Sequence, residues 1–144
     1  SQTLKVGNSD PIGHNAKIDT FERENPPVNI TIPSGDFRTF QYVKRERLPV
    51  RVSCSIHPWM MGWVVIRDNP YMAVTDENGK FTIKNLPVGT YEFMFWQEAA
   101  GYVDEVTVDG KKKSWRRTVE IKIDAGDNDM GAMKVAPDLF DKKR

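Results

Sequence analysis

The sequence contains few of the side chains that cross-link small proteins or bind soft metals. Its 144 residues include one cysteine and two histidines. A single cysteine excludes an intrachain disulfide framework, and three such side chains are too few for a zinc site with four Cys or His ligands. The arrangement of these three residues therefore matters more than their number.

The sequence also lacks an excess of charge of either sign and any long apolar run. Twenty-one Lys and Arg residues face 20 Asp and Glu residues, for a formal net charge of +1, which argues against a nucleic-acid partner. No apolar run approaches the roughly 18–20 residues that span a bilayer. The sequence shows no charged-then-apolar leader at its start. It begins with Ser1 and not with Met, so we expect that a preceding segment was removed.

A sustained helical period is missing as well. Apolar residues instead alternate with polar ones in short runs bounded by Gly, Pro, Asn and Asp, which predicts an all-β protein of packed sheets. Turns are predicted at 78–79, 87–89 and 109–110, and a single helical turn is allowed at 97–101. The predicted strands centre on residues 4–6, 28–32, 50–54, 62–66, 81–83, 91–95, 106–108 and 119–123.

The segment from Cys54 to Met60 combines a thiolate, an imidazole and a thioether. It follows a predicted strand and reads Cys-Ser-Ile-His-Pro-Trp-Met. One Cys, two His and a weak axial Met form the ligand set of a blue-copper site, and this spacing lets the three side chains turn toward one point. Pro58 stiffens the loop by fixing its own φ. Met61 is an alternative axial ligand, although the spacing favours Met60.

The second imidazole of such a site must come from His14, the only other histidine. It follows a turn-rich stretch, residues 8–13, and precedes Asn15. Taken singly, each of these residues has an ordinary structural role, so the combination of ligand types and spacing carries the prediction of a metal site. Nothing in their spacing favours the acidic residues considered as ligands for a harder metal, Asp10, Glu46 and Asp68.

These two segments together resemble the two-part copper motif of the cupredoxins. Residues 9–15 read Ser-Asp-Pro-Ile-Gly-His-Asn, and the loop that begins at Cys54 is similar to the amicyanin type, Cys-x-x-His-Pro-aromatic-Met. The resemblance implies a cupredoxin-like Greek-key β-sandwich over residues 1–68. It also implies that one copper ion, cycling between Cu(I) and Cu(II), is bound by four ligands: His14, Cys54, His57 and Met60.

The same resemblance implies roles for residues around the ligands. Asn15 and Pro58 would form the outer shell, in which Asn15 ties the two ligand loops together. The exposed edge of His57 would be the port for electrons, and an apolar collar would dock a redox partner. The collar residues are Pro58, Trp59 and Met61.

One departure from the cupredoxin pattern concerns the strands before His14. Several strands precede the first ligand in cupredoxins, whereas this sequence has only the one at residues 4–6. We therefore expect missing N-terminal strands, strands supplied by a removed segment or another chain, or strands of the second half that complete the first sheet. An unpaired edge would favour self-association.

The second half resembles a different module. Residues 73–93 contain a Thr-Asp-x-x-Gly turn and a Leu-Pro-x-Gly-x-Tyr turn, as in the carboxypeptidase-regulatory-like, or transthyretin-like, β-sandwich. The resemblance implies a noncatalytic Ig/transthyretin-like scaffold over residues 69–136, followed by a charged tail, 137–144. The two modules together resemble envelope proteins of planctomycete type.

The functional hypothesis is a type 1 copper protein that carries single electrons between redox proteins by transient docking, in the periplasm or outside the cell. Four protein ligands leave no open position for substrate, so an enzyme is not expected. The alternative is an envelope structural, adhesion or copper-capture module without electron transfer. A third reading pairs Cys54 with His57 as nucleophile and base, but the sequence offers no clear orienting partner or oxyanion site.

Overall fold

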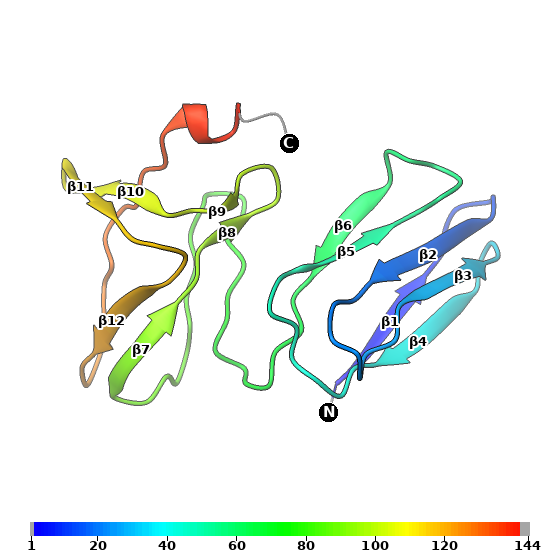
Figure 1. The fold of residues 1–144 in the computed structure, drawn as a ribbon, viewed down its shortest axis with the longest axis horizontal. Helices are drawn as coiled ribbons and strands as arrows, with labels where there is room; N and C mark the ends of the chain where they lie inside the picture. Colours follow the sequence, from blue (N-terminus) through cyan, green and yellow to red (C-terminus); the bar gives the residue numbers. More distant parts are fainter. Residues whose placement is uncertain (1, 142–144) are drawn as a thin grey trace. The chain divides into compact units, whose positions relative to one another are not determined.

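The computed structural model describes residues 2–141 and consists of short β-strands joined by turns and loops, with one 3₁₀ turn, η1 (Pro137–Leu139) (Figure 1). The prediction of an all-β protein is confirmed. The chain divides into two compact units, Ser1–Pro70 and Tyr71–Arg144. The boundary predicted from the sequence followed Asp68.

Unit 1 contains six strands among its described residues. They are β1 (Thr3–Gly7), β2 (His14–Asp19), β3 (Val28–Ile32), β4 (Phe37–Gln41), β5 (Val50–Ser53) and β6 (Met61–Val64). The sequence predicted neither β2 nor β4, since no strand was expected between residues 6 and 28 or between residues 32 and 50. In β4, Phe37 and Phe40 are three residues apart and break the alternating pattern.

The six strands form an antiparallel four-stranded sheet, in the order β3-β2-β5-β6, and a separate β1-β4 pair. Strand β2 lies inside the larger sheet, and its residues alternate between buried and half-buried. Ala16 and Ile18 occupy the buried face with Val50 and Ile32. His14 belongs to the same alternating set, so the first residue of β2 is held at the edge of the core.

A buried polar pair fixes the loops at the other end of β2. The Glu46 carboxylate accepts hydrogen bonds from the backbone N–H of Phe21, at 3.0 Å, and from Nδ2 of Asn25, at 2.8 Å. Asn25 Oδ1 accepts the N–H of Val43 at 3.0 Å. Both polar side chains are 1% exposed, and these bonds join the segment after β2 to the segment before β5.

Unit 2 is built from two-stranded antiparallel pairs. Strand β7 pairs with β12, β8 with β9, and β10 with β11. Its core cluster contains Val103, Val106 and Val108, and Leu139 of η1 packs against it. The last residues of the predicted tail, 142–144, lie outside the described part of the chain. The strands are β7 (Gly89–Phe93), β8 (Trp96–Gln97), β9 (Gly101–Tyr102), β10 (Glu105–Val108), β11 (Lys111–Ser114) and β12 (Val119–Ile123).

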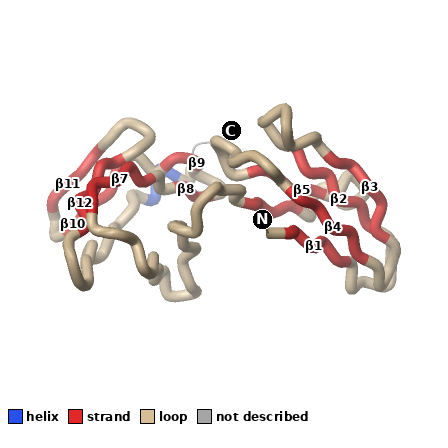
Figure 2. The backbone as a smooth tube through the Cα atoms, turned by 90° about the horizontal axis from the view of Figure 1, so that it is seen from below, coloured by secondary structure: helices blue, strands red, loops and turns tan. Residues whose placement is uncertain are grey.

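Two local predictions for unit 2 are wrong. Residues 71–88 form loop and turns, so the strand predicted at 81–83 is not formed (Figure 2). The turn at Asp76 does form, but β7 takes β12 as its partner, and an alternating pattern without a neighbour makes no ladder. At 97–101 a β8–β9 hairpin replaces the allowed helical turn, because Gln97 Oε1 accepts the N–H groups of Ala99 and Ala100.

In the described residues, each sheet is made of strands from one unit. A search of residues 2–141 for a helix sufficiently long and apolar to cross a membrane finds none.

Candidate metal centre

The backbone of unit 1 brings three predicted ligands to one place. Strands β2 and β5 run antiparallel with Lys17 opposite Ser53, so the end of β5 lies near the start of β2. His14 is the first residue of β2, Cys54 directly follows β5, and His57 lies in the loop between β5 and β6. Residues 40 positions apart in sequence thus meet at one end of the sheet.

The three ligand atoms form a compact triangle. The Nδ1 atoms of His14 and His57 are 2.8 Å apart, and Sγ of Cys54 lies 3.8 Å from each of them. His14 is 8% exposed and Cys54 is 5% exposed, while His57 is half-buried. Within the described residues this is the one group of three His, Cys, Asp or Glu side chains whose ligand atoms come close enough to hold a metal ion.

The size of the triangle matches a bound metal ion. A point in its plane can lie about 2.0 Å from both nitrogens and about 2.1 Å from the sulfur, close to the lengths of metal–imidazole and metal–thiolate bonds. Two imidazoles and a thiolate are ligands that suit copper or zinc. The buried group of His14, Cys54 and His57 could therefore bind a metal ion, and its geometry leaves the identity of the metal open.

The ligand loop is closed by its own backbone. The N–H of Cys54 donates to the carbonyl of Met60 at 3.0 Å, and the N–H of Met60 donates to the carbonyl of His57 at 2.9 Å. Met60 is half-buried at the end of this loop. Met61 is instead the first residue of β6, pairs with Ser53 and is 54% exposed.

Asn15 connects the two segments that carry the ligands. Its Oδ1 accepts the backbone N–H of Ser55 at 2.7 Å and of Ile56 at 3.4 Å, and lies 3.4 Å from the Cys54 Sγ. Its Nδ2 donates to Asn29 Oδ1 at 2.6 Å. Asn15 thus holds the start of the ligand loop against β2 and β3.

The electrostatics of the site favour an ionised thiolate. Burial opposes ionisation of Cys54, but hydrogen bonds from the backbone at Asn15 and His57, and from the His14 imidazole, outweigh it and lower the thiol pKa to about 6. The hydrogen bond to Cys54 in turn raises the pKa of His14, with burial acting in the opposite direction and Asp10 adding to the increase. Metal ligands must be deprotonated, so a thiol that ionises readily suits metal binding.

Sequence reasoning missed one contact of the site. Nε2 of His14 lies 2.9 Å from Oδ2 of Asp10, a residue that was considered only as a ligand for a harder metal. The signal available in the sequence was the position of Asp10 in the turn, four residues before His14. The other two acidic candidates lie in different contacts, because Glu46 accepts backbone N–H groups and Asp68 lies 3.8 Å from Arg45.

Apolar and aromatic side chains surround the half-buried imidazole. The rings of His57 and Trp59 have centroids 5.3 Å apart, and Trp59 is 77% exposed. Ile56 is 56% exposed, and Pro58 is exposed in the same loop. The ligand loop therefore presents apolar surface to solvent beside a ring that belongs to the metal-ligand group.

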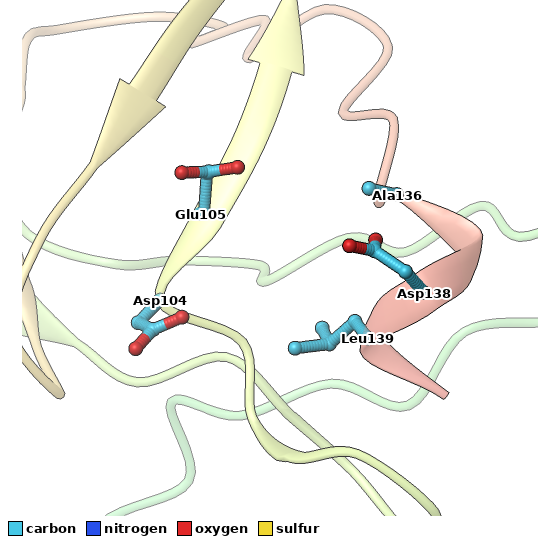
Figure 3. A pocket seen from close by; sticks show the side chains of 5 residues that line it. All are labelled: Asp104, Glu105, Ala136, Asp138 and Leu139. Carbon is cyan, nitrogen blue, oxygen red and sulfur yellow. The ribbon is translucent and has the colours of Figure 1, made fainter. Parts of the chain in front are cut away.

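A pocket in unit 2 has a different character (Figure 3). It is lined by Asp104, Glu105, Ala136, Asp138 and Leu139. The Glu105 carboxylate lies 2.8 Å from Nζ of Lys112, so part of the acidic charge is already paired. These carboxylates are not among the described groups close enough to hold a metal ion.

The chain matches no protein-family model, no curated protein and no solved structure. The contacts and ligand atoms of the site are therefore the basis for inferring a function.

Proposed function

We propose that unit 1 is a type 1 copper protein that carries single electrons between redox proteins. The observation that supports this most is the triangle of Nδ1, Nδ1 and Sγ atoms, with sides of 2.8, 3.8 and 3.8 Å. Two imidazoles and one thiolate in a trigonal arrangement are the strong ligands of blue-copper sites. A bound copper ion would supply a one-electron Cu(I)/Cu(II) couple at this position.

Met60 is the proposed axial ligand. It is half-buried, and its backbone bonds to both Cys54 and His57, so its side chain originates beside the three strong ligands. Met61 lies in β6 and is 54% exposed, which suits a surface role better than a ligand role. Axial thioethers bind weakly at long distance, so Met60 would tune the site more than hold it.

The chain's own contribution is to hold the ligands in place. Strands β2 and β5 fix His14 and Cys54, and Asn15 ties the start of the ligand loop to the sheet. A site that is held in one geometry in both oxidation states needs little rearrangement during electron transfer. The triangle of ligand atoms and the sequence motif around His14 and Cys54 together favour a cupredoxin-like Greek-key β-sandwich for unit 1, with fewer strands before the first ligand than cupredoxins have.

The exposed part of the ligand loop is the proposed docking surface. His57 is the least buried of the three strong ligands, and the ring of exposed Trp59 lies beside it. A small apolar patch suits the brief encounters of redox proteins. Such copper chemistry is in keeping with the periplasm or the cell envelope, with unit 2 acting as a regulatory-like β-sandwich scaffold.

A thiol hydrolase is the second candidate. Asp10, His14 and Cys54 stand in the order orienting group, base and nucleophile, and the Cys54 pKa is lowered to about 6. The burial of Cys54 argues against this activity, because the residue is 5% exposed and its sulfur has a second imidazole at the same distance. A substrate carbonyl would have to reach a sulfur that the protein encloses.

The test is a titration of the full chain with Cu(II). We expect one equivalent to give strong visible thiolate-to-copper absorption that a reductant bleaches and an oxidant restores. Cys54→Ser should abolish the colour, whereas the matched control Ser53→Ala, one residue away in β5, should keep it. Colourless, weakly bound copper would contradict a type 1 site. Coloured copper that fails to cycle would favour copper capture over electron transfer.

A further inference from the structure

The charged neighbour of His14, Asp10, has no role in the electron-transfer function proposed above. Nε2 of His14 lies 2.9 Å from Oδ2 of Asp10. We infer that Asp10 is a positioning residue for the metal centre: it fixes the tautomer of His14 and adds one negative charge beside the ligand set. The inference rests on the proposed metal site.

The geometry assigns the two ring nitrogens of His14 different tasks. Nδ1 faces the ligand triangle, at 2.8 Å from His57 Nδ1 and 3.8 Å from Cys54 Sγ. Nε2 faces the Asp10 carboxylate, which can only accept. When the ring is neutral, the Asp10 carboxylate therefore favours the proton on Nε2, which leaves the lone pair of Nδ1 directed toward the other two ligand atoms. A carboxylate that accepts from a ligating imidazole fixes both the tautomer and the ring orientation.

Asp10 is itself held by the turn before β2. Its backbone N–H donates to Asn8 Oδ1 at 3.0 Å, and its carbonyl accepts from Ser34 Oγ at 2.6 Å. Asn8 is buried, and its Nδ2 donates to the carbonyls of Ile12 and Ile32 at 2.7 and 3.0 Å. These bonds hold the backbone of Asp10 in place independently of His14.

The charge of Asp10 has a separate consequence. A negative group near a metal ion stabilises the more positive oxidation state. Asp10 should therefore strengthen binding of Cu(II) more than of Cu(I) and so lower the reduction potential. Its side chain is 55% exposed, so solvent screens part of this effect. The positioning effect and the charge effect can be separated, because Asp10→Asn keeps a hydrogen-bond acceptor but removes the negative charge.

The positioning role is tested on the metal-free protein. Nitrogen NMR at alkaline pH, where imidazoles are neutral, reports which ring nitrogen of His14 carries the proton. We expect the Nε2–H tautomer in the wild type and in Asp10→Asn, and a mixture of tautomers in Asp10→Ala. An unchanged tautomer in Asp10→Ala would overturn the positioning role. This measurement requires no copper, so its result is independent of the proposed function.

The charge effect is tested on the copper-loaded protein. Asp10→Asn should reduce the Cu(II) affinity relative to Cu(I) by up to about tenfold. A tenfold change for one electron corresponds to about 59 mV, so the potential should rise by up to that amount. Asp10→Ala should weaken Cu(II) binding by about 10- to 100-fold. A potential that is unchanged in Asp10→Asn would overturn the charge effect.

The matched control is Asp19→Asn. Asp19 is in β2 with His14, and its carboxylate pairs with Lys17 at 3.3 Å. The variant also removes one negative charge, at the opposite end of β2 from His14, and should leave both the tautomer and the potential as in the wild type. An equal shift in Asp19→Asn would overturn a specific role for Asp10. Failure of the wild type to bind copper would refute the proposed function and the charge effect, while the tautomer result would stand.

Discussion

The Nδ1 atoms of His14 and His57 lie 2.8 Å apart, although the two residues are 43 positions apart in the sequence. Two nitrogen lone pairs at this distance repel each other unless a proton or a cation lies between them. The fold therefore brings together two groups whose proximity is favourable only with a shared proton or a bound cation. Cys54 Sγ, at 3.8 Å from both, supplies the thiolate that a metal ion needs.

Metal binding should stabilise unit 1. Zn²⁺ is a suitable redox-inert probe, because it binds imidazole and thiolate at about the same lengths as the triangle requires. At about 100 times the dissociation constant, free Zn²⁺ should add about 2.7 kcal/mol to the free energy of unfolding. Calorimetry of the wild type should show a higher melting temperature with Zn²⁺. Equal stabilisation of Cys54→Ser would contradict binding at this site.

The ionisation of Cys54 should control the pH behaviour of the metal-free protein. Its pKa is lowered from 9.0 to about 6, against the opposing effect of burial, by backbone N–H groups and the His14 imidazole. The ultraviolet absorption of the thiolate should therefore titrate near pH 6. His14→Gln should move the midpoint upward. A wild-type midpoint at the value of a free thiol, about 8.5, would refute the predicted stabilisation of the thiolate.

The direction of the stability change follows from linkage. Because folding lowers the Cys54 pKa, its contribution to the free energy of unfolding is fully present above pH 9 and is lost as the pH falls through about 6. The His14 pKa is raised, so its contribution is present below about 6.5 and is lost as the pH rises through the raised value. Urea unfolding of Cys54→Ser should therefore show a weaker decline than the wild type between pH 9 and pH 6.

Asn15→Ala should loosen the ligand loop. The substitution leaves the backbone N–H of Ser55 without the acceptor it now has at 2.7 Å, so we expect a loss of about 1–3 kcal/mol in the free energy of unfolding. The metal affinity should fall together with the stability, because the loop carries Cys54 and His57, two of the three strong ligands. Asn29→Ala is the matched control: it removes only the 2.6 Å contact to Asn15 Nδ2 and should cost less. Equal losses in the two variants would contradict this role of Asn15.

The sequence predicted the group of His14, Cys54 and His57 that could bind a metal ion, because residue type and spacing are local properties of a loop. Cys54 and His57 lie on one loop, and His14 was the only other imidazole. The Asp10 contact was missed, because the direction of a side chain in a turn depends on partners such as Asn8 and Ser34 that lie elsewhere in the fold. The contact between Asp10 and His14 therefore depends on tertiary structure and cannot be read from the local sequence.

The same limit applied to the strands. The apolar alternation of β5 was visible, because one of its faces lies in the core. Strand β2 was missed, because only Ala16 and Ile18 of its three buried positions are apolar and the third is His14. Strand β4 was missed, since its pairing with β1 is a matter of backbone register and its side chains do not alternate between apolar and polar. The strand predicted at 81–83 has the right pattern but no partner, because β7 pairs with β12.

Glu46→Gln tests the polar pair at the far end of β2 from the ligands. The carboxylate accepts the N–H of Phe21 at 3.0 Å and Nδ2 of Asn25 at 2.8 Å, and an amide would turn an NH₂ group toward donors. We expect a loss of about 1.5–3 kcal/mol in urea unfolding. Glu24→Gln, at an exposed position, should change stability by less than about 0.5 kcal/mol. If Glu46→Gln left the free energy of unfolding unchanged, the hydrogen bonds of Glu46 would make no net contribution to stability.

Replacing each methionine beside the loop by leucine should distinguish the axial ligand. Leucine keeps the apolar volume and removes the sulfur, so stability should change by less than about 1.5 kcal/mol in either variant. If Met60 is the axial ligand, Met60→Leu should alter the visible spectrum of the copper protein and raise its reduction potential. Loss of the thioether weakens a donor that stabilises Cu(II), which sets this direction.

Met61→Leu is the matched control for this measurement, because it changes the same atoms one residue later, at a position that is 54% exposed in β6. Its spectrum and potential should match the wild type, while docking of a redox partner to the loop surface could weaken. A change of spectrum in Met61→Leu with none in Met60→Leu would exchange the two assignments. Unchanged spectra in both would mean that the copper ion is held by His14, Cys54 and His57 without a thioether.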